Sequence, residues 1–144
     1  MGLDAVVYKS KAHLPSDPRV QDAPADPDTG QLHCSDEVER MYPVGFFEAN
    51  SKRLGNVANV SDLRDEIEHS AGTIPSVLAS RVLYSATHSG DVINVSDLDQ
   101  LEAEVQIVRL KAGTGSSPFL RCFLENLTDL ISTARREHNP IVFV

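Results

Sequence analysis

The chain has 144 residues, of which 41% are hydrophobic and 24% charged, a composition typical of one folded domain with a single core. Twenty-one acidic residues against thirteen basic ones give a formal charge of −8, which argues against nucleic acid or an anionic membrane as a partner. No stretch approaches the roughly 20 apolar residues of a membrane span, and the N-terminus lacks a secretory signal pattern. We therefore expect one cytoplasmic domain, residues 1–144, with no membrane association.

Both ends of the chain have short β-favouring runs. Residues 3–9 contain the run AVVY, and residues 141–144 read IVFV. Short apolar strands need burial, and the two ends of a compact domain are often close. We expect both strands to lie in one sheet.

A Pro- and Asp-rich segment follows the first strand, at residues 14–30. It contains Pro15, Pro18, Pro24 and Pro27 interspersed with Asp17, Asp22, Asp26 and Asp28. Prolines remove the backbone donors that strands need for pairing, and few apolar residues are present to order the segment by burial, so we expect a mobile loop.

The region after this loop contains several short predicted elements. A short strand is predicted at 31–34, followed by a polar helical turn at 35–41. An aromatic corner at 42–47 should insert Phe46 or Phe47 into the core, and a turn with Lys52 and Arg53 should follow.

Four helical segments are predicted in the rest of the chain. One begins near Ser61 and ends before Gly72, and a second starts at about Pro75. A third has apolar residues at 98, 101, 105 and 108, and the fourth and clearest runs from the N-cap Ser117 to the stop at residues 139–140. The sequence thus predicts an α+β fold: a small sheet that includes both terminal strands, packed by about four helices.

The most specific pattern is an internal repeat. Residues 55–63, GNVANVSDL, recur as residues 90–98, GDVINVSDL, with identity at seven of nine positions. We interpret both copies as helix starts, in which Asn or Ser caps the helix, Asp62 or Asp97 lies in its first turn, and Ser96 with Asp99 approximates a capping box.

The two helix starts also predict a binding surface. If both lie on one face, their acidic side chains would meet a basic protein partner by electrostatic steering. The candidate residues are Asp62, Asp65 and Glu66 in the first segment, and Asp97, Asp99 and Glu102 in the second.

Residues 84–91, YSATHSGD, bring hydroxyls together with His88 and Asp91. A histidine oriented by a carboxylate can act as a general base for a hydroxyl, which keeps a small hydrolase open as an alternative. No nucleophile-elbow pattern is present. We therefore predict that His88 is structural and that His88 and Asp91 hydrogen-bond the loop backbone.

No cofactor, metal or disulfide is predicted. Residues 113–117, GTGSS, precede a helix but lack the lysine of a phosphate-binding loop, and Pro118 removes a backbone donor, so a connector is favoured. The five histidines show no metal-ligand spacing, and the two cysteines should stay reduced in the cytosol.

Three segments carry a family resemblance: residues 1–8 (MGLDAVVY), 84–91 (YSATHSGD) and 139–144 (NPIVFV). Together they resemble a group of small bacterial proteins of unassigned function; some small acidic α/β proteins of that kind are immunity proteins of polymorphic toxin systems. The resemblance implies a stoichiometric inhibitor that covers the active site of a basic toxin, and it supplies no functional residues. A homo-oligomeric structural module joined through an edge strand is a further alternative.

Overall fold

A four-stranded antiparallel sheet forms the centre of the protein in the computed structural model, which describes residues 2–144. Its strands are β1 (Gly2–Tyr8), β2 (Glu48–Asn56), β3 (Val92–Ile93) and β4 (Ile141–Phe143), in the order β2-β1-β4-β3. Ala5 of β1 lies opposite Phe143 of β4. The prediction that the first and last strands share a sheet is confirmed.

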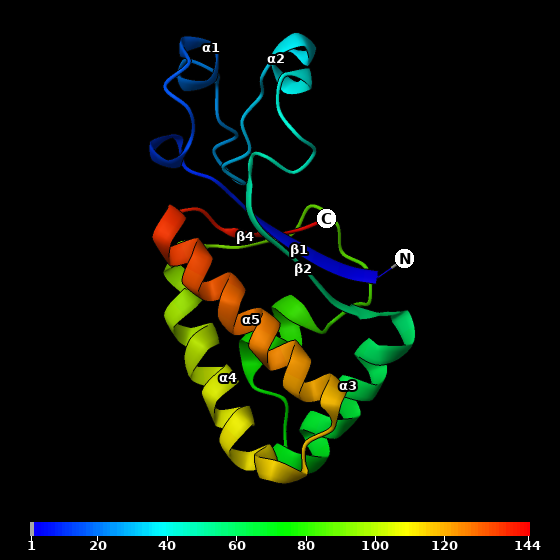
Figure 1. Cartoon of the computed structure of the whole chain (residues 1–144). Coiled ribbons are helices and arrows are strands. Elements are labelled where there is room, and N and C mark those ends of the chain that lie inside the picture. Colours follow the sequence, from blue (N-terminus) through cyan, green and yellow to red (C-terminus); the bar gives the residue numbers. More distant parts are fainter. Residues whose placement is uncertain (1) are drawn as a thin grey trace.

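Three long helices cover one side of the sheet: α3 (Val57–Ala71), α4 (Leu98–Ala112) and α5 (Pro118–Glu137). Helices α5 and α3 contact the strands, and α4 packs against α3 and α5. The segment predicted to be helical from Pro75 ends in a π-helical turn, Leu78–Val82. Figure 1 shows α5 running diagonally below β1 and β2, with α3 and α4 on either side of its lower part. The α+β class predicted from the sequence is confirmed.

The main core lies between the sheet and these helices. Alternate residues of β1, Leu3, Ala5 and Val7, are buried there, as are the predicted apolar positions 98, 101, 105 and 108 of α4. The apolar stripe of α5 fills the centre, and Ser117 caps α5 by accepting a hydrogen bond from the amide of Leu120. The third and fourth predicted helices are therefore confirmed, and they form because their apolar residues recur on one face.

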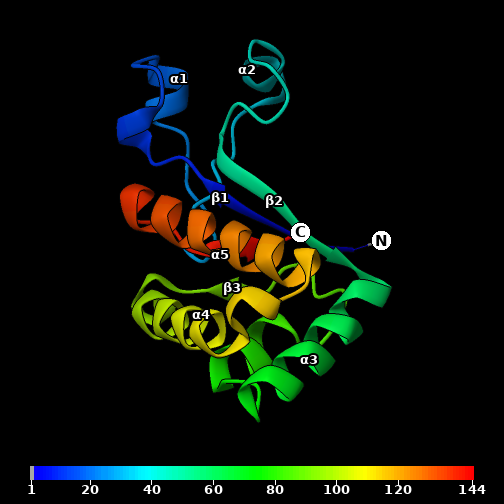
Figure 2. The same cartoon turned by 60° about the horizontal axis from the view of Figure 1, so that its bottom comes forward.

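Residues 9–47 form a separate lobe at the end of β1 and β2, which we call the N-terminal lobe. It projects away from the three long helices (Figures 1 and 2) and contains the 3₁₀ turn Lys11–His13 and two short helices, α1 (Pro18–Gln21) and α2 (Asp36–Arg40). The lobe has its own hydrophobic cluster, in which Leu14, Val20, Leu32 and Val38 are buried. The tight packing of this cluster fixes the path of a segment that has little regular structure.

Three predictions in this region need correction. Residues 14–30 have a defined structure and are not held by turns alone. Val20 is buried against residues outside the segment, and Asp17 caps the short helix α1. The strand predicted at 31–34 is reduced to an isolated bridge between Ala25 and Leu32. Phe46 and Phe47 pack on the lobe cluster and not in the main core. The helical turn at 35–41 is confirmed as α2, which Ser35 caps.

The turn predicted around Lys52 and Arg53 is wrong, because this region is the edge strand β2. Its polar residues pair with polar residues of α5: the Asn50 amide donates a hydrogen bond to the Thr133 hydroxyl over 3.1 Å, and the Lys52 ammonium lies 3.5 Å from the Asp129 carboxylate. These contacts explain a strand with almost no hydrophobic alternation.

Both copies of the repeat lead into a helix, as predicted, but the two helix starts differ in structure, and the side-chain cap predicted for the second copy is not formed. In the first copy, Asn56 and Asn59 form a reciprocal capping box and α3 begins at Val57, which leaves Asp62 beyond the first turn. In the second copy, residues 92–93 pair with β4 as β3, a 3₁₀ turn follows at Val95–Asp97, and α4 begins at Leu98 without a side-chain cap hydrogen bond. Strand pairing overrides the local helix signal in the second copy.

Candidate functional site

The acidic residues predicted to form one binding surface lie at opposite ends of α5. Glu66 of α3 accepts hydrogen bonds from the Ser117 amide (2.7 Å) and hydroxyl (2.5 Å) at the start of α5. At the other end, the Arg135 guanidinium lies 2.7 Å from Asp99 and 2.6 Å from Glu102. A 20-residue helix is roughly 30 Å long, so Glu66 lies too far from Asp99 and Glu102 to form one continuous acidic patch with them (Figure 1).

Most of these carboxylates already have partners within the chain. Hydrogen bonds from Arg135 lower the pKa of Glu102, and Asp97 lies 3.6 Å from the guanidinium of Arg81. Asp62 and Asp65 alone among the six are exposed and form no ion pair or hydrogen bond through their side chains with any residue in the range 2–144. The predicted surface is thus reduced to these two side chains on α3.

His88 and Asp91 do lie together, as their sequence proximity predicted. The His88 Nε2 atom lies 2.9 Å from the Val82 carbonyl oxygen, and Nδ1 lies 3.4 Å from Asp91 Oδ2. The Tyr84 hydroxyl donates a hydrogen bond to Asp91, which raises the pKa of Tyr84. The His88 ring packs against Phe143 of β4, with 4.1 Å between ring centroids.

This arrangement suits a structural role better than a catalytic one. A general base needs one ring nitrogen free to reach a substrate hydroxyl. In His88 one nitrogen faces a main-chain carbonyl, the other faces Asp91, and only 2% of the side chain is exposed. His88 bonds a backbone carbonyl, but that of Val82 in the π-helical turn and not one in its own loop as predicted, and the Asp91 side chain accepts a hydrogen bond from Tyr84.

Two buried carboxylates were missed by the sequence reasoning. Glu104 accepts hydrogen bonds from the amides of Val77 (2.7 Å) and Leu78 (3.3 Å), and thereby caps the helical segment that ends in the π-helical turn. Glu137 accepts hydrogen bonds from the 3₁₀ turn at the base of the N-terminal lobe. No local pattern reveals either role, because each partner lies far away in the sequence.

Glu137 fixes the lobe to the end of α5. Its carboxylate accepts hydrogen bonds from the Ser10 amide (2.9 Å) and hydroxyl (3.0 Å), and it lies 2.6 Å from His13 Nδ1. Burial by itself would raise the pKa of Glu137, but the hydrogen bonds from His13 and Ser10 outweigh it and lower the pKa to about 2. The carboxylate is therefore ionised at neutral pH and holds the lobe in a defined position.

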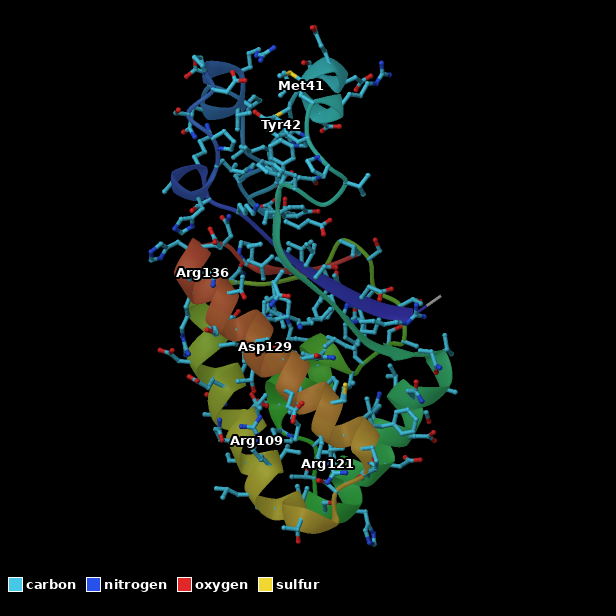
Figure 3. All side chains as sticks on the ribbon, viewed as in Figure 1. Met41, Tyr42, Arg109, Arg121, Asp129 and Arg136 are labelled. Carbon is cyan, nitrogen blue, oxygen red and sulfur yellow. The ribbon has the colours of Figure 1, made fainter. Side chains whose placement is uncertain are left out.

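The outer surface of this lobe combines exposed acidic and apolar side chains. Asp36, Glu37 and Glu39 of α2 are exposed and form no ion pair or hydrogen bond through their side chains within residues 2–144. In the loop that follows, Met41 is 54% exposed and Val44 fully exposed. We call these five residues the lobe surface; Figure 3 shows Met41 near the top of the lobe.

A shallow cavity of about 560 Å³ adjoins the lobe surface. Tyr42, Pro43 and Phe47 contribute to its wall, and Arg40 is the one basic residue that lines it. Tyr42 stacks on Phe46, with 4.6 Å between ring centroids, which fixes the loop that presents Val44. A rigid apolar loop beside acidic side chains is an arrangement suited to protein recognition.

The chain matches no model of a known protein family, and it has no significant match among curated proteins or solved structures. Within residues 2–144, no three His, Cys, Asp or Glu side chains are grouped so as to hold a metal ion. No helix in the same range is long and apolar enough to cross a membrane.

Proposed function

We propose that this chain is a binding protein whose lobe surface docks against a basic segment of a protein partner. The observation that carries the proposal is the exposure of Val44 and Met41 beside three acidic side chains of α2 that form no ion pair within residues 2–144. Exposed apolar side chains gain free energy when a partner covers them, by roughly 25 cal/mol per Å² of apolar surface buried. The acidic residues around them would select a basic partner.

The overall charge supports the same partner class. A charge of −8 attracts basic proteins and raises the association rate, while the apolar contacts chiefly slow dissociation. Because the lobe projects from the body of the protein, it has room to enter a concave surface such as an active-site cleft (Figure 2). The family resemblance described above suggests a specific partner: a basic toxin that this chain would inhibit stoichiometrically, as immunity proteins do.

The proposal is tested by affinity capture with the full chain from a lysate of the organism that carries its gene. We expect one basic protein to be retained by the wild type and lost with Val44→Asp. The matched control is Leu110→Asp, since Leu110 is 82% exposed on α4, outside the lobe. Binding must then be reproduced with the two purified proteins. Capture of no basic protein, or of one that both variants retain equally, would refute the proposal.

One observation favours the homo-oligomeric alternative: β2 is a nine-residue strand at the edge of the sheet. Several features protect this edge. Lys52 and Arg53 place charges on the strand, and the Asn126 amide donates a hydrogen bond to the Arg53 carbonyl over 3.3 Å. We therefore favour binding of a different protein over self-association through β2.

A further inference from the structure

A cleft separate from the lobe surface lies between α4 and α5, near the loop that joins them. It has a volume of about 440 Å³, within the range of small-molecule sites. Arg109 of α4 and Arg121 of α5 both line it, and Figure 3 shows both on the lower halves of these helices. The cleft therefore has two basic residues in its lining, although the protein as a whole has a charge of −8.

Both arginines retain donors for a ligand. The Arg109 Nη2 atom donates to the Thr128 hydroxyl over 3.1 Å, which fixes the side chain but uses one of its five N–H groups. The Arg121 side chain is exposed and forms no hydrogen bond or ion pair within residues 2–144. Together, the guanidinium of Arg109, which Thr128 positions, and the guanidinium of Arg121, whose donors are all available, can bind a planar oxyanion through paired hydrogen bonds.

The remaining wall of the cleft indicates the class of ligand. Ala112 and Leu124 supply apolar surface, and Gly113 and Ser116 belong to the connector between α4 and α5. The start of α5 is already occupied by the Glu66 carboxylate, so the arginines and not the helix N-terminus must bind an anion. Glu125 also lines the cleft, and its negative charge disfavours a dianion such as phosphate.

We propose that this cleft binds a small organic monocarboxylate, with the carboxylate between Arg109 and Arg121 and the carbon skeleton against Ala112 and Leu124. This site does not depend on the lobe surface or on the function proposed above. The probe is hexanoate, titrated into the isotopically labelled full chain at low ionic strength and followed by amide chemical shifts. We expect saturable shifts at Gly113, Ser116 and Leu124 at millimolar concentrations, and weaker binding of inorganic phosphate.

Matched variants make the test specific. Arg121→Gln should weaken hexanoate binding by about tenfold, because a bidentate charge-assisted contact is lost. Lys111→Gln removes the same charge from α4 outside the cleft and should leave the affinity unchanged. The amide spectrum of each variant also reports that it is folded. Absence of saturable shifts, equal losses in both variants, or tighter binding of phosphate than of hexanoate would overturn the proposal.

Discussion

Buried polar side chains join distant segments of this protein. His88, Glu104 and Glu137 each have less than a tenth of their surface exposed, and each bonds a residue on another element or loop. A buried polar group is costly unless it is hydrogen-bonded, so these contacts specify the arrangement of segments as well as stabilising it. Their removal should therefore reduce stability more than removal of exposed charges.

Glu137→Gln tests the contact between the lobe and α5. The neutral amide removes the negative charge from the group that Ser10 and His13 contact, and its NH2 group cannot accept the hydrogen bond that Oε1 accepts from Arg136. The free energy of unfolding at pH 7 should therefore fall by about 2 kcal/mol. The contribution of Glu137 depends on pH in a defined direction. Its pKa of about 2 lies below the ordinary value of 4.5, so the stabilisation is complete above pH 4.5 and disappears as pH falls toward 2.

Urea unfolding at pH 7 and pH 3 measures this effect. The difference between wild type and Glu137→Gln should shrink at pH 3. Glu125→Gln, an exposed carboxylate on the same helix, should change stability by less than about 0.5 kcal/mol. An equal effect of Glu137→Gln at both pH values would contradict the predicted role of the ionised carboxylate.

His88→Ala tests whether His88 has a structural role. Loss of the ring contact with Phe143 and of the bond to the Val82 carbonyl should lower the unfolding free energy by about 2–4 kcal/mol. His69→Ala, at an exposed position of α3, should have little effect. A broad hydrolase screen completes the test: activity of the wild type that disappears in a folded His88→Ala protein would show that the catalytic alternative is correct.

At the level of elements, hydrophobic periodicity correctly predicted the helices whose apolar faces are buried in the main core. Residues 98, 101, 105 and 108, and the long stripe of α5, repeat at helical spacing and are buried as expected. Strand β2 was missed because its side chains pair with polar residues of α5, so it shows no alternating apolar pattern. The repeat at 55–63 and 90–98 did not predict the difference between its two copies, because similar sequences have different neighbours in the fold. Only the second copy pairs with β4.

The candidate site was predictable in part. His88 and Asp91 are close in the sequence, and they remain close in the structure. The acidic helix starts were assigned to one surface because each carried similar residues, yet the orientation of α3 and α4 relative to α5 depends on the whole fold. The lobe surface could not be predicted from the sequence, because the exposure of Val44 depends on how residues 9–47 pack.

Glu66→Ala distinguishes the predicted partner-binding role of Glu66 from the capping role that its contacts indicate. Removal of the carboxylate that bonds the Ser117 amide and hydroxyl should lower the unfolding free energy by about 1–2 kcal/mol. Asp65→Ala serves as the control and should be nearly neutral, because Asp65 is next to Glu66 but exposed and forms no ion pair within the described residues 2–144. Thermal and urea unfolding measure both. Equal stability of the two variants would argue against the cap.

At the scale of the whole molecule, the two proposed binding regions are separate. The lobe surface lies at the end of the protein where residues 9–47 project, and the arginine-lined cleft lies near the α4–α5 connection at the other end (Figures 1 and 3). The opposite charges of the two regions suit different ligands: a basic protein segment at the lobe and a small carboxylate at the cleft.

The association rate of the captured partner with charge-reversed variants tests the central claim most directly. Two double variants change the charge equally: Glu37→Lys with Glu39→Lys in the lobe, and Asp62→Lys with Asp65→Lys on α3. All four carboxylates are exposed. We predict that the lobe variant slows association by about tenfold at low salt and the α3 variant by less than about twofold, with both differences reduced as salt increases. Equal slowing by both variants, or slowing by the α3 variant alone, would contradict the assignment of the lobe as the binding surface.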